Sequence, residues 1–476
     1  MAQQKLVSQK EDFSKWYTDV ILQAGLADYS PVKGCMVIKP YGYALWENIQ
    51  MELNNRIKAA GVKNAYFPLF IPKSYIDREA EHVEGFAPEL ATVTHVGNEK
   101  LDEPLVIRPT SETIMYATFK DWIHSYRDLP LLINQWANVV RMEKRTRLFL
   151  RTTEFLWQEG HTCHATSDEA EQETMRAIGM YDEFYTACLA IPGYIGKKSD
   201  GEKFPGAVYT TTVEALAKDG KAIQGCTSHF LGQGFAKSIG IEFQNVDNEL
   251  AYVWQTSWGL TTRVIGALVV VHGDDKGLQL PPVIAPSQVV IVPIAKTDEE
   301  KAQVSSIAEE IKRALPNVRI EIDSRDYLSP GAKFYDWELK GVPVRIEIGP
   351  RDFAASQVIA ARRDTSEKET IPMSGIVERI PALLREIQKS MYAKALAFRD
   401  EHTFKVETYE EFKKIIDTEA GFAHAHWCES KECEAKIKEE TKATTRCRVF
   451  DEPEEKGSCI YCGKESTRRI FFAKAY

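Results

Sequence analysis

The sequence of 476 residues lacks a hydrophobic run long enough to cross a membrane. Its longest clean apolar stretch lies around Gly266–Val271, whereas a transmembrane helix needs about 20 apolar residues. The first ten residues are polar and contain no apolar core of a secretory signal. We therefore expect a cytoplasmic protein with no membrane partner.

Low-complexity tracts are also absent. A composition of 44% hydrophobic and 27% charged residues is typical of a soluble globular protein, and the length predicts about two to four domains. The net charge of −9 is mild evidence against a nucleic-acid partner. A local basic surface can still bind phosphates, so the overall charge decides little.

The nine cysteines do not have the pattern of a disulfide scaffold, because the chain is long and carries no secretion signal. The spacings Cys428-x4-Cys433 and Cys459-x2-Cys462 give two short-spaced pairs, which match a structural tetrahedral zinc site. Redox-active thiols are the weaker alternative, since the two pairs lie far apart in the sequence. The less favoured ligands nearby are His424, His426 and Cys447.

Hydrophobic spacing divides the chain into three expected domains, 1–282, 283–375 and 376–476. In the first, Tyr43–Ala60 has an apolar residue at every fourth position and predicts a helix with one buried face. A short strand within Gly34–Gly42 precedes it. The proline-rich break Pro281–Pro286 marks the first boundary.

Beyond this break, strands and helices alternate, which predicts a small α/β domain with a mostly parallel sheet. A helical connector of some 27 residues is expected after about Gly375, and it leads into the cysteine-bearing tail. The expected strands are Val289–Ile294, Val318–Asp323, Val344–Ile348 and, as the last, Gln357–Ala361, and the expected helices are Asp298–Leu315 and Gly331–Lys340.

The most informative segment pairs Arg141 with Glu143 and continues through an arginine-rich turn to Arg151–His161. In an extended strand, residues two apart share a face, so a guanidinium and a carboxylate would lie side by side. Arginine binds phosphate or carboxylate at two points, which suits an anion bound next to an amine. A solvated surface ion pair is the alternative that the Arg-x-Glu alone would favour.

Over some twenty residues this segment resembles motif 2 of the class II aminoacyl-tRNA synthetases, in the form seen in the prolyl-tRNA synthetases. The resemblance implies that Arg141 binds the α-phosphate and the amino-acid carboxylate. Met142 stands where the family often has Trp, and we expect its side chain on the other face of the strand. The resemblance implies that ATP is also bound by Glu143, Thr152 and Phe155. It implies that the proline pocket is formed by Trp157, Glu159, His161, Phe204 and Phe86.

Two further segments resemble the same family. Arg108–Thr113 contains a Thr-Ser-Glu word that implies proline contacts from Thr110 and Glu112, although a helix cap would have the same residues. Gln224–Gln233 resembles a Gln-Gly-Gly-Thr-Ser-His word, with Cys226 as the departure. It implies ATP contacts from Gln224 and Thr227 and a proline contact from His229, which otherwise would be a core histidine.

The remaining motifs complete the resemblance. Gly259 followed four residues later by Arg263 resembles motif 3, which implies that Arg263 and Thr261 bind ATP and that Arg263 is catalytic together with Arg141. The strand and helix at 34–60 resemble motif 1, which forms the dimer interface in that class. The tail ending at Tyr476 is similar to the zinc-binding domain of the archaeal and eukaryotic type.

The resemblance implies an α/β protein: an α+β catalytic domain with an antiparallel sheet, an α/β anticodon-binding domain, and a small α+β zinc-binding domain. It implies a homodimer that uses ATP, Mg²⁺ and a structural Zn²⁺ to join L-proline to tRNA(Pro). We expect misactivation of alanine without self-editing, since only about ninety residues separate His161 from Gln255. The alternatives are a catalytically inactive paralogue and a synthetase for threonine or histidine.

Overall fold

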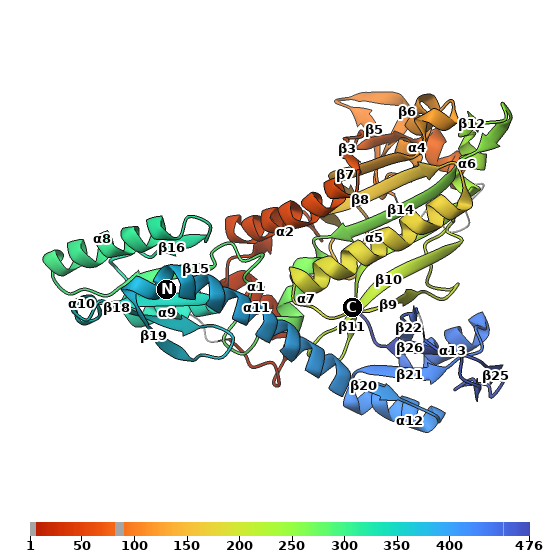
Figure 1. Ribbon diagram of the computed structural model, residues 1–476. Helices are drawn as coiled ribbons and strands as arrows, with labels where there is room; N and C mark the ends of the chain where they lie inside the picture. Colours follow the sequence, from red (N-terminus) through yellow and green to blue (C-terminus); the bar gives the residue numbers. More distant parts are fainter. Residues whose placement is uncertain (1–5, 81–89, 451) are drawn as a thin grey trace.

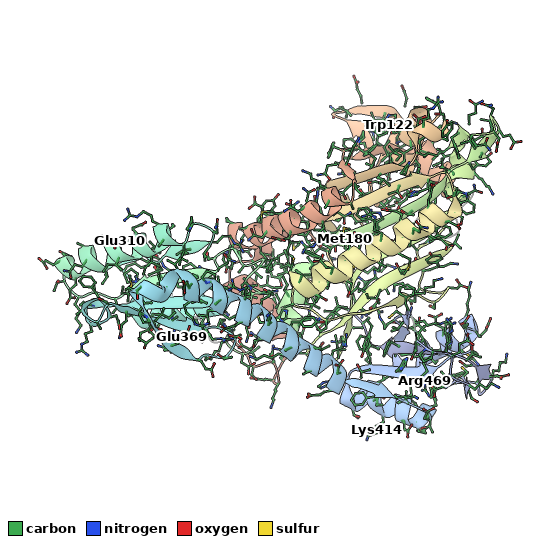
Figure 2. The ribbon with its side chains drawn as sticks, viewed as in Figure 1. Trp122, Met180, Glu310, Glu369, Lys414 and Arg469 are labelled. Carbon is green, nitrogen blue, oxygen red and sulfur yellow. The ribbon has the colours of Figure 1, made fainter. Side chains whose placement is uncertain are left out.

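The computed structural model describes residues 6–80, 90–450 and 452–476. It has a mixed α/β fold in which a large sheet is flanked by two smaller units, one built around residues 289–372 and one around residues 403–476 (Figure 1). In Figure 2, Met180 lies beside the large sheet, Glu310 and Glu369 lie in the second unit, and Arg469 lies in the C-terminal unit.

Eight strands form the large sheet, in the order β23-β9-β10-β11-β14-β8-β7-β3. All neighbouring pairs are antiparallel except β3 with β7. The strands span β3 Lys63–Asn64, β7 Leu131–Val140, β8 Glu154–His164, β9 Tyr194–Lys197, β10 Tyr209–Leu216, β11 Ala222–Gly232, β14 Trp254–Thr261 and β23 Arg448–Val449. The edge strand β23 comes from the C-terminal unit, so the far end of the chain completes the sheet.

One face of this sheet packs on the helix α5, Ser167–Ala187 (Figure 1). On β8, Gln158 points toward α5 and accepts a hydrogen bond from the Tyr181 hydroxyl at 2.5 Å. A side chain at Gly160 would meet the Trp258 ring at 2.2 Å, so glycine is required there. The intervening residues Trp157, Glu159 and His161 share the opposite face, as their spacing predicted.

The N-terminal helices cover one end of the sheet. The helix predicted over 43–60 is confirmed as α2, Pro40–Ala59, with Leu45, Ile49, Leu53 and Ile57 buried. It begins three residues earlier than predicted, because Pro40 suits the first helical turn. The other elements of this region are α1 Phe13–Gln23, β1 Ala27–Tyr29, β2 Met36–Ile38, α3 Lys73–Ala80, α4 Glu112–Trp122, α6 Gly234–Ile239 and α7 Arg263–His272, with β4 Phe70–Pro72, β5 Thr92–Val96, β6 Glu99–Ile107, β12 Glu242–Gln244 and β13 Leu250–Tyr252.

The second unit contains a five-stranded sheet in the order β16-β15-β17-β18-β19. The prediction that Gln357–Ala361 is its last strand was wrong, because Lys368–Pro372 adds another by a tight reversal. The sheet is also less parallel than predicted, since β18 and β19 run antiparallel to their neighbours. The elements are β15 Val289–Pro293, α8 Asp298–Ala314, β16 Ile320–Ile322, α9 Pro330–Leu339, β17 Val344–Ile348, α10 Pro350–Ala354, β18 Gln357–Arg362 and β19 Lys368–Pro372.

The predicted connector is the long helix α11, Ile376–Glu401, which runs from the second unit to the C-terminal unit (Figure 1). There a four-stranded sheet packs with two helices. These elements are β20 Thr403–Lys405, α12 Tyr409–Lys414, β21 Phe422–His426, α13 Lys431–Thr441, β22 Thr444–Thr445 and β26 Arg469–Ala473, with the hairpin β24 Gly457–Ser458 and β25 Glu465–Ser466. Within the residues described, we find no helix both long and apolar enough to span a bilayer.

Candidate active site

A cavity of about 500 Å³ opens on the face of the large sheet that α5 does not cover. The start of α4, the end of β7, strands β8, β10, β11 and β14, and the start of α7 all contribute to its lining. The cavity brings together these predicted residues: Thr110, Glu112, Arg141, Glu143, Phe155, Trp157, Glu159, His161, Phe204, Gln224, Thr227, His229, Thr261 and Arg263. Residues up to about 150 positions apart in the chain therefore share one site.

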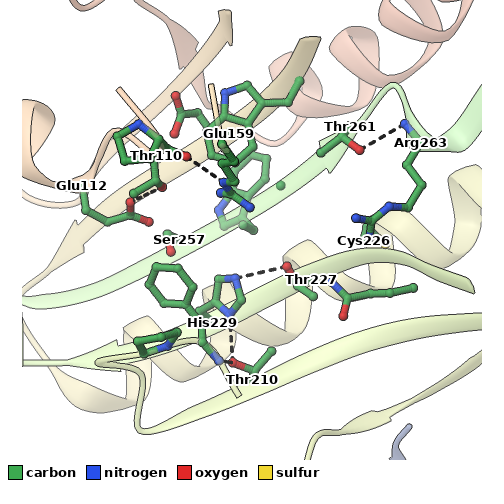
Figure 3. Close-up of a pocket in the computed structure, with 18 of the residues that line it drawn as sticks. Thr110, Glu112, Glu159, Thr210, Cys226, Thr227, His229, Ser257, Thr261 and Arg263 are labelled. Atoms are coloured by element: carbon green, nitrogen blue, oxygen red, sulfur yellow. Dashed lines mark hydrogen bonds between the residues drawn. The ribbon is translucent and has the colours of Figure 1, made fainter. Parts of the chain in front are cut away.

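Hydrogen-bond acceptors gather at one side of the cavity, where Thr110, Glu112 and Glu159 lie (Figure 3). Thr110 donates its hydroxyl to Glu112, and both side chains are almost fully buried. Ser111 occupies the N-cap position of α4 but makes no capping bond there. Its hydroxyl instead donates to Glu159 at 2.5 Å. The segment thus starts a helix, but Thr110 and Glu112 line the cavity and Ser111 is bonded to Glu159 instead of the helix end.

His161 is bound to the same group of acids. Its Nε2 lies 3.0 Å from Glu159 Oε2, and its Nδ1 lies 3.1 Å from the Tyr116 hydroxyl. Burial disfavours the charged imidazole, but the bond to Glu159 and the nearby carboxylates of Glu112 and Glu159 raise the pKa of His161 overall. Glu159 is further fixed by Gln135, which donates to Oε1 at 2.8 Å. This part of the cavity is therefore polar, anionic and held rigidly.

Arg141 lies just beyond β7, which ends at Val140, so Arg141 and Glu143 are not strand residues as predicted. Both still line the cavity. The Arg141 guanidinium faces the Phe155 and Trp157 rings at 5.5 and 5.4 Å, and its Nε donates to Pro109 O at 2.8 Å. The guanidinium is therefore held by one hydrogen bond and two ring contacts at the wall of the cavity. The expectation that Met142 points to the opposite face was wrong, since it also lines the cavity.

Arg263 lies on the other side of the cavity, beside Thr261 (Figure 3). It is the first residue of α7, at the predicted strand-to-helix junction. Its Nε donates to Leu150 O at 3.1 Å, and its backbone N donates to Thr261 Oγ1 at 3.1 Å. Burial and then the positive charge of Arg141 lower the pKa of Arg263. Because the positive charges of Arg141 and Arg263 repel each other, an anion bound between them would stabilise both.

His229 lies between two threonines, with Nδ1 2.9 Å from Thr210 Oγ1 and Nε2 3.1 Å from Thr227 Oγ1 (Figure 3). Its ring is 4.7 Å from the Phe204 ring, centroid to centroid. Burial, followed by the charges of His161, Lys198 and Arg141, lowers the pKa of His229 to about 3. It is therefore a neutral imidazole at physiological pH, whereas His161 is biased toward the charged form.

Two predicted residues do not join this group. Thr152 is buried and does not line the cavity, so its contact with ATP stays a prediction. Phe86 lies outside the described residues. Cys226 does line the cavity, and burial raises its thiol pKa, which fits a small inert residue rather than a reactive thiol.

Sequence reasoning missed several residues of the cavity. Ser257 contributes a buried hydroxyl for which the described residues supply no hydrogen-bond partner. The segment between β9 and β10 adds Lys198, Glu202, Lys203 and Pro205. A strand of alternating polar residues gave a weak signal for Ser257. Lys198 and Lys203 belong to a polar segment whose sequence is typical of a solvent-exposed loop.

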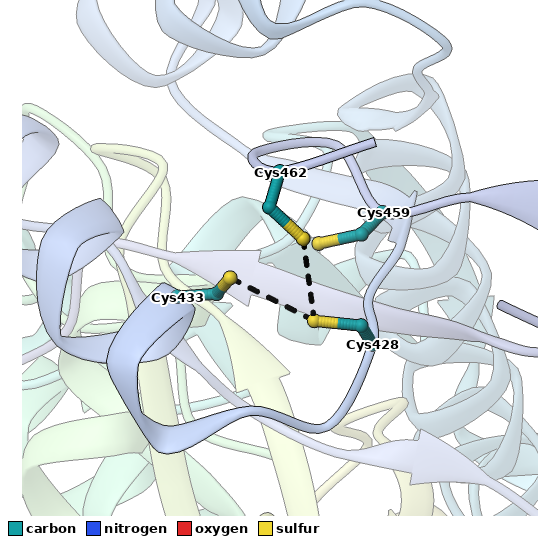
Figure 4. A group of neighbouring side chains, drawn as sticks. All are labelled: Cys428, Cys433, Cys459 and Cys462. Carbon is teal, nitrogen blue, oxygen red and sulfur yellow. Dashed lines mark hydrogen bonds between the residues drawn. The ribbon is translucent and has the colours of Figure 1, made fainter. Parts of the chain in front are cut away.

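The four cysteines predicted as metal ligands meet in the C-terminal unit (Figure 4). Their sulfur atoms all lie within 4.8 Å of one another, and Cys428 Sγ is 3.7 Å from both Cys433 Sγ and Cys462 Sγ. Four sulfurs bound to zinc at about 2.3 Å in a tetrahedron would be roughly 3.8 Å apart. The cluster of Cys428, Cys433, Cys459 and Cys462 therefore fits a tetrahedral zinc ion, and Cys447 lies outside it.

The mostly antiparallel sheet, with an arginine after β7 and another at the β14–α7 junction, is the arrangement expected of a class II aminoacyl-tRNA synthetase core. A family model described as tRNA synthetase class II core domain (G, H, P, S and T) matches residues 93–272. Models described as Anticodon binding domain and as Prolyl-tRNA synthetase, C-terminal, match residues 288–383 and 409–476.

Whole-chain relatives identify the family more narrowly. Proline–tRNA ligase of Prosthecochloris aestuarii is 54% identical over 99% of this chain and 100% of the relative, and that of Roseiflexus castenholzii is 52% identical over 100% of both. The crystal structure of prolyl-tRNA synthetase from Cryptosporidium parvum, complexed with halofuginone and AMPPNP, is 41% identical with a TM-score of 0.94 over 99% of each chain. The chain belongs to the prolyl-tRNA synthetase family, and its activity is the ligation of proline to tRNA with ATP as substrate.

Proposed function

We propose that the cavity binds proline at its acidic side and ATP at its opposite side, with Arg141 and Arg263 as the catalytic residues. The supporting observation is the distribution of charge: Glu112 and Glu159 lie at one side and Arg263 at the other, and Arg141 faces the Phe155 and Trp157 rings. An amino acid needs an acceptor for its ammonium group, and a triphosphate needs cations. One cavity offers both.

In the first step the ionised proline carboxylate attacks the α-phosphorus of ATP. A new bond forms between the carboxylate oxygen and phosphorus, the α–β bridging bond breaks, and pyrophosphate leaves with its electrons. No protein base is required. Arg141 and Arg263 bind the oxygens that gain charge, and the fixed geometry of both arginines keeps the reactants in line.

Mg²⁺ supplies further neutralisation of phosphate charge when bound. Glu143 lines the cavity, and we propose that it would hold Mg²⁺ there, because Mg²⁺ prefers oxygen ligands such as carboxylates. Glu143 is held by Arg151 at 2.9 Å, which fixes its orientation. In the second step a terminal ribose hydroxyl of tRNA attacks the prolyl carbonyl, and AMP leaves.

The acidic side is suited to the ammonium group of proline. Glu112 and Thr110 supply the acceptors, Glu159 and His161 form the floor, and Phe204 beside His229 forms an apolar wall for the ring. Gln224, Thr227, Phe155 and Thr261 are left for the nucleotide. A base stacked on an aromatic ring gains about 1–3 kcal/mol, which favours Phe155 under adenine.

Replacing Glu112 by Gln is expected to raise the KM for proline by roughly ten- to a hundredfold while the KM for ATP stays within twofold. The shape is kept, and the loss is that of a hydrogen bond to a charged group, about 1.5–3 kcal/mol. Steady-state ATP–pyrophosphate exchange measures both constants. Glu143→Gln is the matched control, and it is expected to raise the KM for ATP and leave the KM for proline unchanged. If Glu112→Gln raised the KM for ATP and Glu143→Gln raised the KM for proline, the proposed orientation of the two substrates would be contradicted.

We also propose that the enzyme misactivates alanine and does not correct the error. Alanine is smaller than proline, so the pocket cannot exclude it sterically and discriminates by about 1–3 kcal/mol for each lost methylene contact. Between β8 and β14 the chain forms α5, β9, β10, β11, α6 and the β12–β13 hairpin. Three of these strands belong to the large sheet, so this interval leaves little room for a hydrolytic domain.

Alanyl-tRNA(Pro) incubated with the purified enzyme is expected to persist as long as it does in buffer. The assay omits AMP and pyrophosphate, because these allow deacylation by simple reversal of synthesis. Prolyl-tRNA(Pro) treated in the same way is the control. Rapid hydrolysis of the alanyl ester alone would reveal an editing site that this proposal does not contain.

We propose that Cys428, Cys433, Cys459 and Cys462 bind a structural Zn²⁺, supported by the sulfur spacing described above.

We also propose domain boundaries at 282 and 375, supported by the end of α7 at His272, the start of β15 at Val289 and the start of α11 at Ile376. We further propose that the enzyme acts in the cytoplasm, with tRNA(Pro) as its partner.

We propose a homodimer formed through the segment that resembles motif 1. Large apolar side chains are exposed on this segment and next to it, where a second copy would cover them. Their exposures are Tyr29 63%, Val32 63%, Val37 49%, Tyr43 43% and Met51 47%. An exposed apolar surface of this kind favours an interface between proteins.

A further inference from the structure

The C-terminal unit, residues 403–476, packs against one wall of the cavity. We call residues 198–205, between β9 and β10, the wall segment; Lys198, Glu202, Lys203, Phe204 and Pro205 of this segment line the cavity. Strand β23 of the C-terminal unit pairs with β9, directly before the wall segment. At Gly196 a side chain would lie 1.9 Å from the Arg448 carbonyl oxygen, so the two backbones are in close contact.

The first anchor of the wall segment is a buried hydrogen-bond network at Ser199. The Ser199 hydroxyl donates to Glu434 Oε1 at 2.6 Å, and Thr445 donates to the same oxygen. Glu434 lies on α13, and all three side chains are buried. A side chain at Gly201 would lie 2.6 Å from the other carboxylate oxygen of Glu434. The C-terminal unit therefore contacts the backbone of the wall segment as well as its serine.

The second anchor is a buried ion pair. Arg446 donates from Nε and Nη2 to Glu214 Oε2, at 3.0 and 2.7 Å. The other oxygen of Glu214 accepts from Thr212 at 2.9 Å and lies 3.7 Å from Lys198 Nζ. Glu214 is 0% exposed and Arg446 5%. Because a buried carboxylate is costly without a partner, Arg446 fixes Glu214, and Glu214 fixes the first residue of the wall segment.

A third contact lies at the surface, where Lys438 Nζ is 3.2 Å from Glu202 Oε1. Residues 198, 199 and 202 are thus each joined to the C-terminal unit, directly or through Glu214. Two positions further on is Phe204, whose backbone N donates to Thr210 Oγ1 at 2.9 Å and whose ring packs on His229. A shift of the anchored residues would move this ring.

We propose that the C-terminal unit positions the wall segment and thereby sets the affinity for proline. Glu434 and Arg446 are positioning residues: they do not touch the substrate, and they act through the placement of Phe204. This inference rests on the proposed proline pocket. It gives the C-terminal unit a role in the activation step, which does not require tRNA.

The test uses Glu434→Gln and Arg446→Met in the full chain. Each is expected to raise the KM for proline at least about fivefold in ATP–pyrophosphate exchange, with the KM for ATP and the kcat within twofold. Arg448→Met is the matched control, because Arg448 lies two residues from Arg446 but its side chain pairs with Glu429 inside the C-terminal unit. Its constants are expected to equal those of the unmodified protein. A variant that merely folds less well would lose kcat through a smaller active fraction and keep its KM.

Phe204→Ala and the double variant Phe204→Ala with Glu434→Gln separate the inference from the pocket on which it rests. If Glu434 acts through Phe204, the double variant has about the same KM for proline as Phe204→Ala alone, because the two changes are coupled. An unchanged KM in Phe204→Ala would contradict the proposed pocket. Two results would overturn the positioning role while Phe204→Ala raises the KM for proline. The first is a normal KM for proline in Glu434→Gln and Arg446→Met. The second is additive effects of the two changes in the double variant.

Discussion

Arg141→Ala is expected to lower the kcat of proline-dependent ATP–pyrophosphate exchange by roughly 10²–10³-fold or more. A donor directed at developing charge in a preorganised site contributes about 3–4 kcal/mol to transition-state stability. Arg141 is held for this role by its bond to Pro109 O and by the Phe155 and Trp157 rings. Exchange assayed at saturating proline and ATP measures the loss at the activation step, before tRNA is involved.

Arg141→Lys is expected to recover only part of the rate, because lysine keeps the charge but lacks the planar fork and the stacking surface. Arg145→Ala is the matched control, since Arg145 is exposed in the same turn and does not line the cavity. It is expected to leave exchange unchanged. Near-normal exchange by Arg141→Ala, with correct folding, would remove Arg141 from the mechanism.

Removal of zinc is expected to have the second largest effect. Protein purified without chelator should contain about one zinc per chain, whereas Cys433→Ser should contain little and should unfold its C-terminal unit at a lower temperature. Structural zinc binding contributes on the order of 10 kcal/mol to the folding of small metal domains, and loss of one thiolate forfeits much of it. Metal analysis and thermal unfolding measure the two effects.

Cys447→Ser is the control for this experiment, because its thiol is buried in the same unit but outside the cluster. It should retain the metal. The absence of zinc from unmodified protein, with the four clustered thiols freely titratable, would contradict the assignment. The metal is expected to be structural, since four protein thiolates leave no open coordination position.

Periodicity predicted the local elements well. The four-residue spacing of Leu45, Ile49, Leu53 and Ile57 reflects one buried helix face, and α2 has that face. The alternation at Trp157, Glu159 and His161 reflects a strand with two environments, and β8 has them. Such patterns follow from local geometry, so they are readable without knowing the fold.

The convergence of the site could be predicted only through the family resemblance, because spacing gives no distance between Thr110 and Arg263. Features decided by long-range packing were missed. The end of β7 before Arg141 and the extra strand β19 left no local signal that we recognised. The pairing of Ser199 with Glu434 joins residues 235 positions apart, and a serine in a polar turn gives no hint of such a partner.

The central claim, that this cavity activates proline, is tested most directly by ATP–pyrophosphate exchange of the unmodified protein with each of the twenty amino acids in turn. Proline is expected to support fast exchange, alanine slow exchange at high concentration, and the others little above background. We expect the preference over alanine to come from contacts between the proline ring and Phe204. Fast exchange with threonine or histidine in place of proline, or no exchange with any amino acid in correctly folded protein, would contradict the account.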